Sequence, residues 1–204
     1  MHLKEDKVLD TIKVRGEFAI TLIKEDGTTE KYEEKNLIMD LARETMAELL
    51  GGYSDGKIIN KFVLGTKGNV GDNILQYIRV GENGFDTTRT KLFSEENSTA
   101  QYFTLTFNPS SSSSDTTVTG NGIMRGQSSS DAQQCEIERT VSGRVLTMTF
   151  RISKEAANDP SGDNPIAYTE AAMYCGDKIF SMKTFPARVK EASVSMEIVW
   201  SIIF

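Results

Sequence analysis

The last residues of the sequence alternate between apolar and other side chains. The apolar side chains occupy every second position, namely Val194, Met196, Ile198, Trp200, Ile202 and Phe204. Because successive side chains of a β-strand point to opposite faces of a sheet, this period of two predicts a strand with one apolar face. Such a face requires a second layer of protein to cover it. We therefore predict a strand built into the core of a β-protein, with Phe204 sealed inside.

The opposite face of this strand is mixed in character. It carries Ser195, Glu197, Val199, Ser201 and Ile203. A half-polar, half-apolar face of this kind suits contact with another subunit. We therefore treat the terminal strand as a candidate for both core and interface.

Similar alternation elsewhere predicts a mainly β fold. Strand-like segments occupy residues 14–22, 58–64, 101–107, 134–141, 144–153, 166–175 and 178–185. Asp26-Gly27, Ser142-Gly143 and Gly176-Asp177 are turn signals between neighbouring segments and predict hairpins. The sequence thus predicts an antiparallel β-sandwich or barrel-like domain of about nine to eleven strands. We expect the last three strands to lie side by side as a meander.

The segment that follows the first turn is rich in charge. Residues 28–35 contain Lys31, Glu33, Glu34 and Lys35, with Tyr32 as the large apolar residue. Charges on a strand discourage pairing with other chains, so this composition is typical of an exposed edge strand. We predict an edge strand here that offers a surface for contacts.

One segment has the period of a helix. Ile38, Ala42, Met46 and Leu49 recur at intervals of three and four residues. This spacing predicts one amphipathic helix over about residues 39–50, with Asp40 near its start to cap free amides.

The length of 204 residues fits a single β-rich domain over 1–204. Its middle third is polar and rich in glycine, so residues 66–131 are a candidate loop-rich insertion or subdomain within that domain. Within it, we expect the serine-rich stretch 109–115 and the stretch 120–131 to be loops.

Composition argues against several classes of protein. The net charge is −6 and the basic residues are scattered, so we expect no direct contact with nucleic acid and none with a membrane. The start of the chain is charged, which indicates no standard signal peptide. His2 is the only histidine, which argues against serine and cysteine nucleophile systems and against most catalytic zinc sites. Cys135 and Cys175 are far apart and are expected to be buried free thiols.

Two motifs resemble ligand sites. Residues 51–58 nearly match a phosphate-binding loop, but Ile58 replaces the hydroxyl residue and a helix precedes the loop, so we reject nucleotide binding. The spacing of a calcium loop is matched by Asp159, Ser161, Asp163 and Glu170. Strand-like flanks, Asn164 in place of glycine and Pro165 after it make this a weak candidate metal site, and we predict no cofactor.

Two stretches resemble a known class of protein. Residues 36–68 contain NLIMDLARETMAELLGG and then INKFVLGTKG, and residues 169–204 contain KTFPARVK and end in VWSIIF. Together they resemble small structural proteins of tailed-bacteriophage virions, in which an Asn-Leu-led helix precedes a strand ending in Leu/Phe-Gly-Thr-Gly. Those chains close with a Lys-Thr-Phe-Pro turn and a strand ending Trp-(Ser/Thr)-Ile-x-Phe. The resemblance implies a tail, neck or collar, or baseplate component, or a fibre-attachment module, without enzymatic activity.

The leading hypothesis is therefore a non-enzymatic structural component of a virion. Its partners would be further copies of itself and other virion proteins in a symmetric assembly, built in the host cytoplasm. The alternative is a carbohydrate- or receptor-binding module of a tail fibre, with a host glycan as partner. A third hypothesis is a hydrolase that uses paired carboxylates, since the separation of such groups is a property of the fold.

Overall fold

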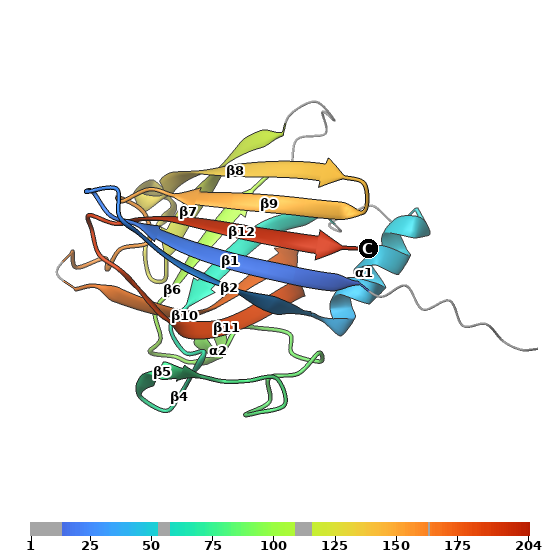
Figure 1. Ribbon diagram of the computed structural model, residues 1–204, viewed down its shortest axis with the longest axis horizontal. Helices are drawn as coiled ribbons and strands as arrows, with labels where there is room; N and C mark the ends of the chain where they lie inside the picture. Colours follow the sequence, from blue (N-terminus) through green and yellow to red (C-terminus); the bar gives the residue numbers. More distant parts are fainter. Residues whose placement is uncertain (1–13, 53–57, 109–115, 163) are drawn as a thin grey trace, which may run out of the picture.

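The computed structural model describes residues 14–52, 58–108, 116–162 and 164–204. Ten antiparallel strands form a closed barrel in the order β1-β12-β9-β8-β7-β6-β3-β10-β11-β2 (Figure 1). The strands are β1 (Arg15–Ile23), β2 (Thr29–Ile38), β3 (Ile59–Gly65), β6 (Tyr102–Phe107), β7 (Thr117–Met124), β8 (Gln133–Ser142), β9 (Val145–Ile152), β10 (Ile166–Cys175), β11 (Lys178–Lys190) and β12 (Ser195–Ile203). The predicted mainly β, barrel-like fold is confirmed.

The remaining elements lie outside the barrel wall. They are the helix α1 (Asp40–Leu50), the short strands β4 (Asn69–Val70) and β5 (Asn73–Tyr77), the single helical turn α2 (Phe93–Glu96) and a 3-10 turn, Ser129–Asp131. The strands β4 and β5 pair only with each other. Within the described ranges, no helix is long and apolar enough to span a membrane.

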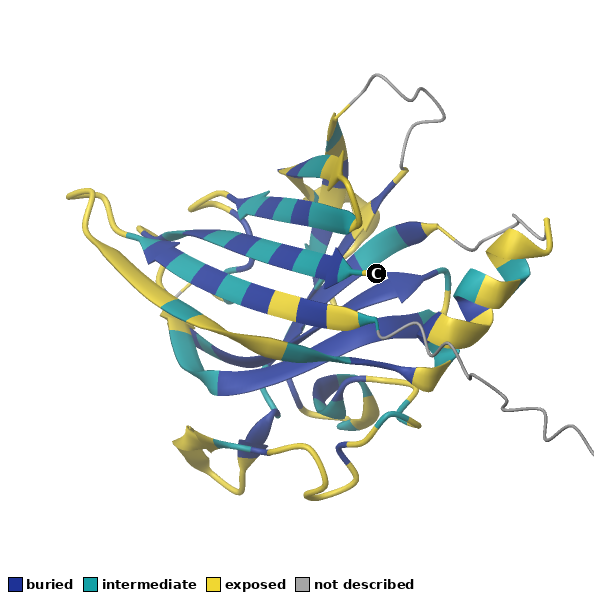
Figure 2. Ribbon diagram, turned by 45° about the vertical axis from the view of Figure 1, so that its right-hand side comes forward, coloured by how far each residue is buried: buried dark blue, intermediate teal, exposed yellow. Residues whose placement is uncertain are grey.

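The interior of the barrel is filled by aromatic and aliphatic side chains. Trp200 is fully buried, and its ring meets that of Phe18 edge-on at a centroid distance of 4.9 Å. Phe62 and Phe150 stack at 4.3 Å. The inward positions of β1, β9 and β12 alternate with half-exposed ones, visible as bands along the strands in Figure 2. The period of two in the sequence therefore corresponds to the inner and outer faces of the barrel wall.

The terminal strand β12 lies between β1 and β9. The expected meander of the last three strands is wrong, because only β10 and β11 are neighbours there. The inward positions are buried from Val194 to Ile202, but Phe204 is 39 % exposed. Its backbone N–H donates to the Arg144 carbonyl, beyond the end of β12. The expectation that Phe204 is sealed inside is therefore wrong, because the strand ends at the rim of the barrel.

The charged strand β2 is one of the strands of the barrel wall. It pairs with β1 along most of its length and with β11 through Leu37 and Ile38. The predicted edge strand is therefore correct for residues 29–36, which pair with β1 alone, and it fails only where Leu37 and Ile38 close the barrel. Beyond the two residue pairs with β11, the Lys183 ammonium donates to the Glu34 carboxylate across the gap at 2.6 Å. Glu34, one of the charged residues that suggested an edge strand, thus links β2 to β11.

The strand β7 lies where the sequence predicted a loop. Gly120 and Gly122 lie in the stretch 120–131 that was expected to be a loop, but they face bulky neighbours in the barrel. A Cβ atom on Gly122 would lie 2.1 Å from the Phe103 ring, and one on Gly120 would lie 2.8 Å from side-chain carbons of Leu105 and of Ile137. Glycine is required there because the adjacent strands place large side chains against this backbone.

The predicted helix is confirmed as α1, which crosses one end of the barrel near the C-terminus (Figure 1). Ala42 and Met46 pack against the inner core. Asp40 begins the helix but makes no side-chain cap. Its carboxylate instead accepts hydrogen bonds from Arg43 at 3.0 Å and from the Thr87 hydroxyl at 2.9 Å.

Candidate functional site

Residues 66–101 leave the barrel between β3 and β6 and return to it, and we call this segment the excursion. It contains β4, β5 and α2. The excursion covers the outer face of β3, β10 and β11, and a second apolar cluster lies beneath it. This outer cluster consists of Met39, Val63, Ile78, Phe85, Leu92, Ala172, Tyr174, Ile179 and Met182. The wall is thus buried on both faces here, which accounts for the nearly continuous burial of β10.

A buried carboxylate fixes the excursion to the barrel. Glu170 of β10 is fully buried, beside a β-bulge in the pairing with β11. Its Oε1 accepts from the Ser94 N–H at 2.7 Å, and its Oε2 accepts from the Phe93 N–H at 2.9 Å. Burial raises the pKa of Glu170, and the hydrogen bonds from Ser94 and Phe93 oppose this effect. The carboxylate therefore satisfies backbone donors that α2 would otherwise bury unpaired.

The hydroxyl of Ser94 connects this carboxylate to the end of β3. Ser94 Oγ donates to Glu170 Oε1 at 2.5 Å and accepts from the backbone N–H groups of Thr66 at 2.7 Å and Lys67 at 3.0 Å. A hydroxyl has one donor and two acceptor positions, so all of its capacity is used. Ser94 is itself fully buried. The start of the excursion and its helical turn α2 thus meet at one hydroxyl.

The motif Gly65-Thr-Lys-Gly68 owes its glycines to this contact. A Cβ on Gly65 would lie 2.5 Å from Ser94 Oγ and 2.6 Å from Glu170 Oε1, and one on Gly68 would lie 2.4 Å from the Thr169 carbonyl oxygen. The Gly68 N–H donates to the Thr169 hydroxyl at 2.9 Å. Residues 36–68 and 169–204 therefore meet here, since Gly68 ends the first stretch and Thr169 begins the second.

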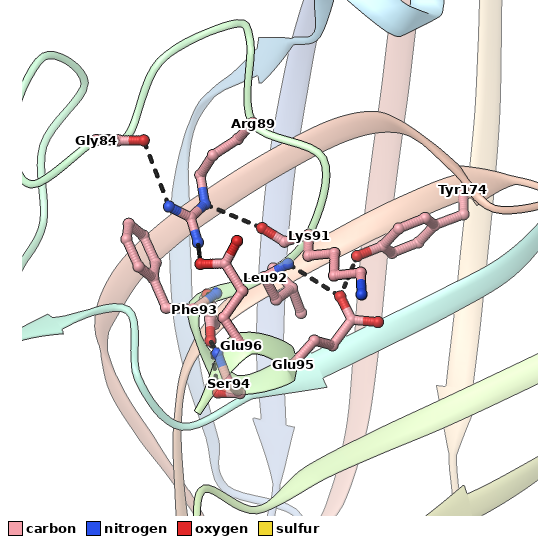
Figure 3. A network of polar contacts seen from close by, with 10 residues as sticks. Gly84, Arg89, Lys91, Leu92, Phe93, Ser94, Glu95, Glu96 and Tyr174 are labelled. Atoms are coloured by element: carbon pink, nitrogen blue, oxygen red, sulfur yellow. Dashed lines mark hydrogen bonds and ion pairs between the residues drawn. The ribbon is translucent and has the colours of Figure 1, made fainter. Parts of the chain in front are cut away.

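A second set of contacts surrounds α2 (Figure 3). The Arg89 guanidinium pairs with the Glu96 carboxylate, donates to the Lys91 carbonyl at 2.9 Å and lies 3.6 Å from the centre of the Phe93 ring. The Tyr174 hydroxyl of β10 donates to the Glu95 carboxylate, which also accepts from the Leu92 N–H at 2.9 Å. These contacts fold the segment before α2 onto itself and tie α2 to β10.

The hairpin β4–β5 is held at its base. The Thr184 hydroxyl of β11 donates to the Ile78 carbonyl at 2.5 Å, and the Ile78 N–H donates to the Gly68 carbonyl at 2.8 Å. The Tyr77 hydroxyl reaches Glu34 Oε2 at 3.3 Å. The base of this hairpin is therefore connected to β2, to β11 and to the loop that follows β3.

The hairpin and the residues just after it expose four large apolar side chains. Their exposed fractions are 38 % for Val70, 45 % for Ile74, 75 % for Leu75 and 59 % for Val80, and we call these residues the hairpin patch. Val70 and Leu75 line one surface hollow. Figure 2 shows β4 and β5 projecting from the barrel, with much of this part exposed. Exposed apolar side chains that share a hollow on a firmly held element, as Val70 and Leu75 do, are typical of protein–protein contact sites.

Among the described residues, the predicted ligands Asp159, Ser161 and Glu170 are not brought together as a metal-binding group. Glu170 is committed to Ser94 and Phe93, away from the loop that carries Asp159. Asp159 accepts from the Ser161 N–H at 3.1 Å and from the Asn164 amide at 3.2 Å, as in an ordinary turn. Asp163 lies outside the described residues. The match to the calcium-loop spacing thus combines residues of a turn with a buried carboxylate that has a structural role.

Other candidate chemistry is dispersed over the described part of the chain. No group of three or more metal-binding side chains is present among the residues that the structure describes. Cys135 and Cys175 are buried and form no disulfide within the described ranges, and burial raises the pKa of the Cys135 thiol to about 12. His2 and residues 53–57 of the rejected phosphate-loop match lie outside the described ranges.

Sequence reasoning missed the anchoring role of Glu170 and Ser94. The available signal was the position of Glu170 inside an otherwise apolar strand, IAYTEAAMYC, where a carboxylate requires buried donors. Nothing comparable marks Ser94, which occurs in a polar stretch.

Comparisons of the chain with protein-family models, with curated protein sequences and with solved structures found no match.

Proposed function

We propose that this chain is a non-enzymatic structural component of a tailed-phage virion, at the tail, neck or collar, baseplate or fibre attachment. It acts by packing against further copies of itself and against other virion proteins in a symmetric assembly. The observation that carries the proposal is the hairpin patch, because four large apolar side chains are exposed on or just after a hairpin whose base is tied to the barrel strands β2 and β11. The resemblance of residues 36–68 and 169–204 to virion proteins supplies the virion context.

The interior of the barrel supports an architectural role. Aromatic side chains from β1, β3, β9 and β12 meet in its centre, with Phe62 and Trp200 at a centroid distance of 6.3 Å. A filled barrel provides a rigid body of fixed shape. The excursion is held against that body by Glu170 and Ser94, so the hairpin patch is presented in a preformed position. Preformed surfaces lower the entropy cost of association.

The test replaces Leu75 with serine, alone and together with Ile74→Ser. Exposed side chains of this kind contribute little to folding, so we expect the unfolding midpoint to stay near that of the wild type. Incorporation into virions, measured by complementation of a deletion phage and by mass spectrometry of purified particles, should fall at least tenfold. Val141→Ser is the matched control, because Val141 is 76 % exposed on β8 and outside the hairpin patch.

Three results separate this proposal from its alternatives. Loss of incorporation with Leu75→Ser but not with Val141→Ser supports an assembly role for the hairpin patch. Normal particles that have lost adsorption to the host would instead favour the receptor- or glycan-binding module. Absence of the wild-type chain from virions would refute the virion role.

A further inference from the structure

A lysine is buried at the end of β11, beneath the loop of residues 153–158. Lys190 is 1 % exposed, and its Nζ donates to the Lys154 carbonyl at 3.0 Å, the Glu191 carbonyl at 3.1 Å and the Asn158 side-chain Oδ1 at 2.8 Å. Burial lowers the pKa of Lys190 to about 8, and the charge of Glu155 opposes this effect. Three donated hydrogen bonds use all three protons of the ammonium, so the amine becomes nucleophilic when it loses one of them in mildly alkaline solution.

The side chain of Asn158 is held against this amine. Its Nδ2 donates to the Lys154 carbonyl at 2.6 Å, the same oxygen that accepts from Lys190. The preceding residue, Ala157, is buried and has φ of 58°, a left-handed conformation that is unfavourable for alanine. The Tyr168 hydroxyl donates to the Ala157 carbonyl at 2.9 Å. Strained backbone fixed by buried contacts is typical of functional positions.

We propose that Lys190 and Asn158 form an intramolecular isopeptide bond. The neutral Nζ attacks Cγ of Asn158, and the new Nζ–Cγ bond replaces the Cγ–Nδ2 bond. One proton passes from Nζ to Nδ2, which leaves as ammonia, so the reaction consumes no oxidant, reductant or further reactant. Because Nζ is 2.8 Å from Oδ1 and a C=O bond is about 1.2 Å long, Nζ lies within about 4 Å of Cγ.

The arrangement brings together the attacking and the leaving nitrogen. Both donate to the Lys154 carbonyl, which holds the two nitrogens at one shared acceptor. The product would link β11 covalently to the loop that follows β9, two segments that are distant in sequence. A link of this kind restricts the unfolded chain as a disulfide does. This inference is independent of the proposed virion role.

The test is the mass of the full-length wild-type protein, measured under denaturing conditions after the folded protein has been incubated at about pH 7 and at about pH 9. We expect the loss of one ammonia molecule, faster at the higher pH because more of the amine is neutral. Proteolysis should yield a branched peptide that joins Asn158 to Lys190. Lys190→Arg and Asn158→Ala should each abolish this peptide.

Lys154→Arg is the matched control, because it changes an exposed neighbouring side chain and keeps the carbonyl. It should leave the branched peptide unchanged. A succinimide at Asn158 would also release ammonia, but it would persist in Lys190→Arg and give no branched peptide, and that result would overturn the proposal. A wild-type mass that still equals the mass calculated from the sequence, after incubation at the higher pH, would overturn it too. The mass of the wild-type protein and its branched peptide still decide the proposal even if Lys190→Arg fails to fold.

Discussion

The barrel and the excursion are held together by different kinds of contact. In the barrel, β12 pairs with β1 and β9 in continuous register, so that Trp200 lies opposite Phe18 on one side and Met148 on the other. In the excursion, the regular pairing is limited to the short hairpin β4–β5, and single polar side chains such as Glu170 determine where the chain lies. A repeating pattern thus specifies the first region, whereas a few individual residues specify the second.

The largest effect should follow from emptying the centre of the barrel. Trp200→Ala removes a fully buried ring and should lower the free energy of unfolding by about 4 kcal/mol, measured by urea denaturation. Trp200→Phe is the control, since it retains part of the ring and removes an indole N–H that has no hydrogen-bond partner among the described residues. It should cost less than Trp200→Ala. Equal costs would show that the volume of this side chain does not determine barrel stability.

A smaller and more local effect should follow from removing the anchor of the excursion. Glu170→Ala leaves the N–H groups of Phe93 and Ser94 without acceptors and should lower the free energy of unfolding by about 3 kcal/mol. Amide hydrogen exchange should accelerate in residues 66–101 more than in β1, β9 and β12. If amide exchange accelerates equally over the whole chain, the barrel and the excursion unfold as one unit. The contrast between these two regions would then be wrong.

The pH dependence of stability tests the same residue in a different way. Because burial raises the pKa of Glu170 above its unfolded value, the folded state binds more protons than the unfolded state between these two values. The contribution of Glu170 to the free energy of unfolding should therefore decrease as the pH rises from the unfolded pKa through the folded one. Glu170→Gln carries no such proton, so the difference between its unfolding curve and that of the wild type should change over this range. A constant difference would contradict the raised pKa.

The barrel could be predicted from the sequence to the level of fold class and hairpins. Strict alternation around Trp200 indicated a core strand, and turn signals such as Ser142-Gly143 correctly indicated hairpins such as β8–β9. The order of strands could not be read in this way, because nothing in the alternation specifies which strand lies beside β12. The closure of the barrel between β2 and β11 could not be predicted either, because only two residue pairs, at Leu37 and Ile38, form it.

The candidate site was largely unpredictable for a related reason. Glu170 and Ser94 are separated by more than seventy residues, and Glu170 lies beside a β-bulge in the pairing of β10 with β11 that the alternation does not mark. Spacing along the chain instead associated Glu170 with Asp159, which gave the incorrect cation site. Local patterns identify side chains that share a strand or a helix face, but they do not identify contacts between elements that are distant in sequence.

A moderate effect is expected at Gly122, where the barrel itself depends on one small residue. A methyl group there would lie 2.1 Å from Cζ of Phe103, whose side chain is buried in the inner core, so Gly122→Ala should lower the free energy of unfolding by about 2 kcal/mol. Adding Phe103→Leu should recover part of this loss by opening space. If the double variant is no more stable than the sum of the single ones predicts, the two residues are not coupled through this contact.

The smallest effect should come from the outer surface of the barrel. Arg151 on β9 forms ion pairs with Glu136 and Glu138 of β8 and with Glu197 of β12, and all four side chains are at least one-third exposed. Because exposed ion pairs are screened by solvent, Arg151→Met should change the free energy of unfolding by less than about 1 kcal/mol, and less still in high salt. A large loss in urea denaturation would mean that this outer face contributes as much as the filled interior. We ascribe the stability of the barrel to the aromatic contacts of Trp200, and that result would contradict this assignment.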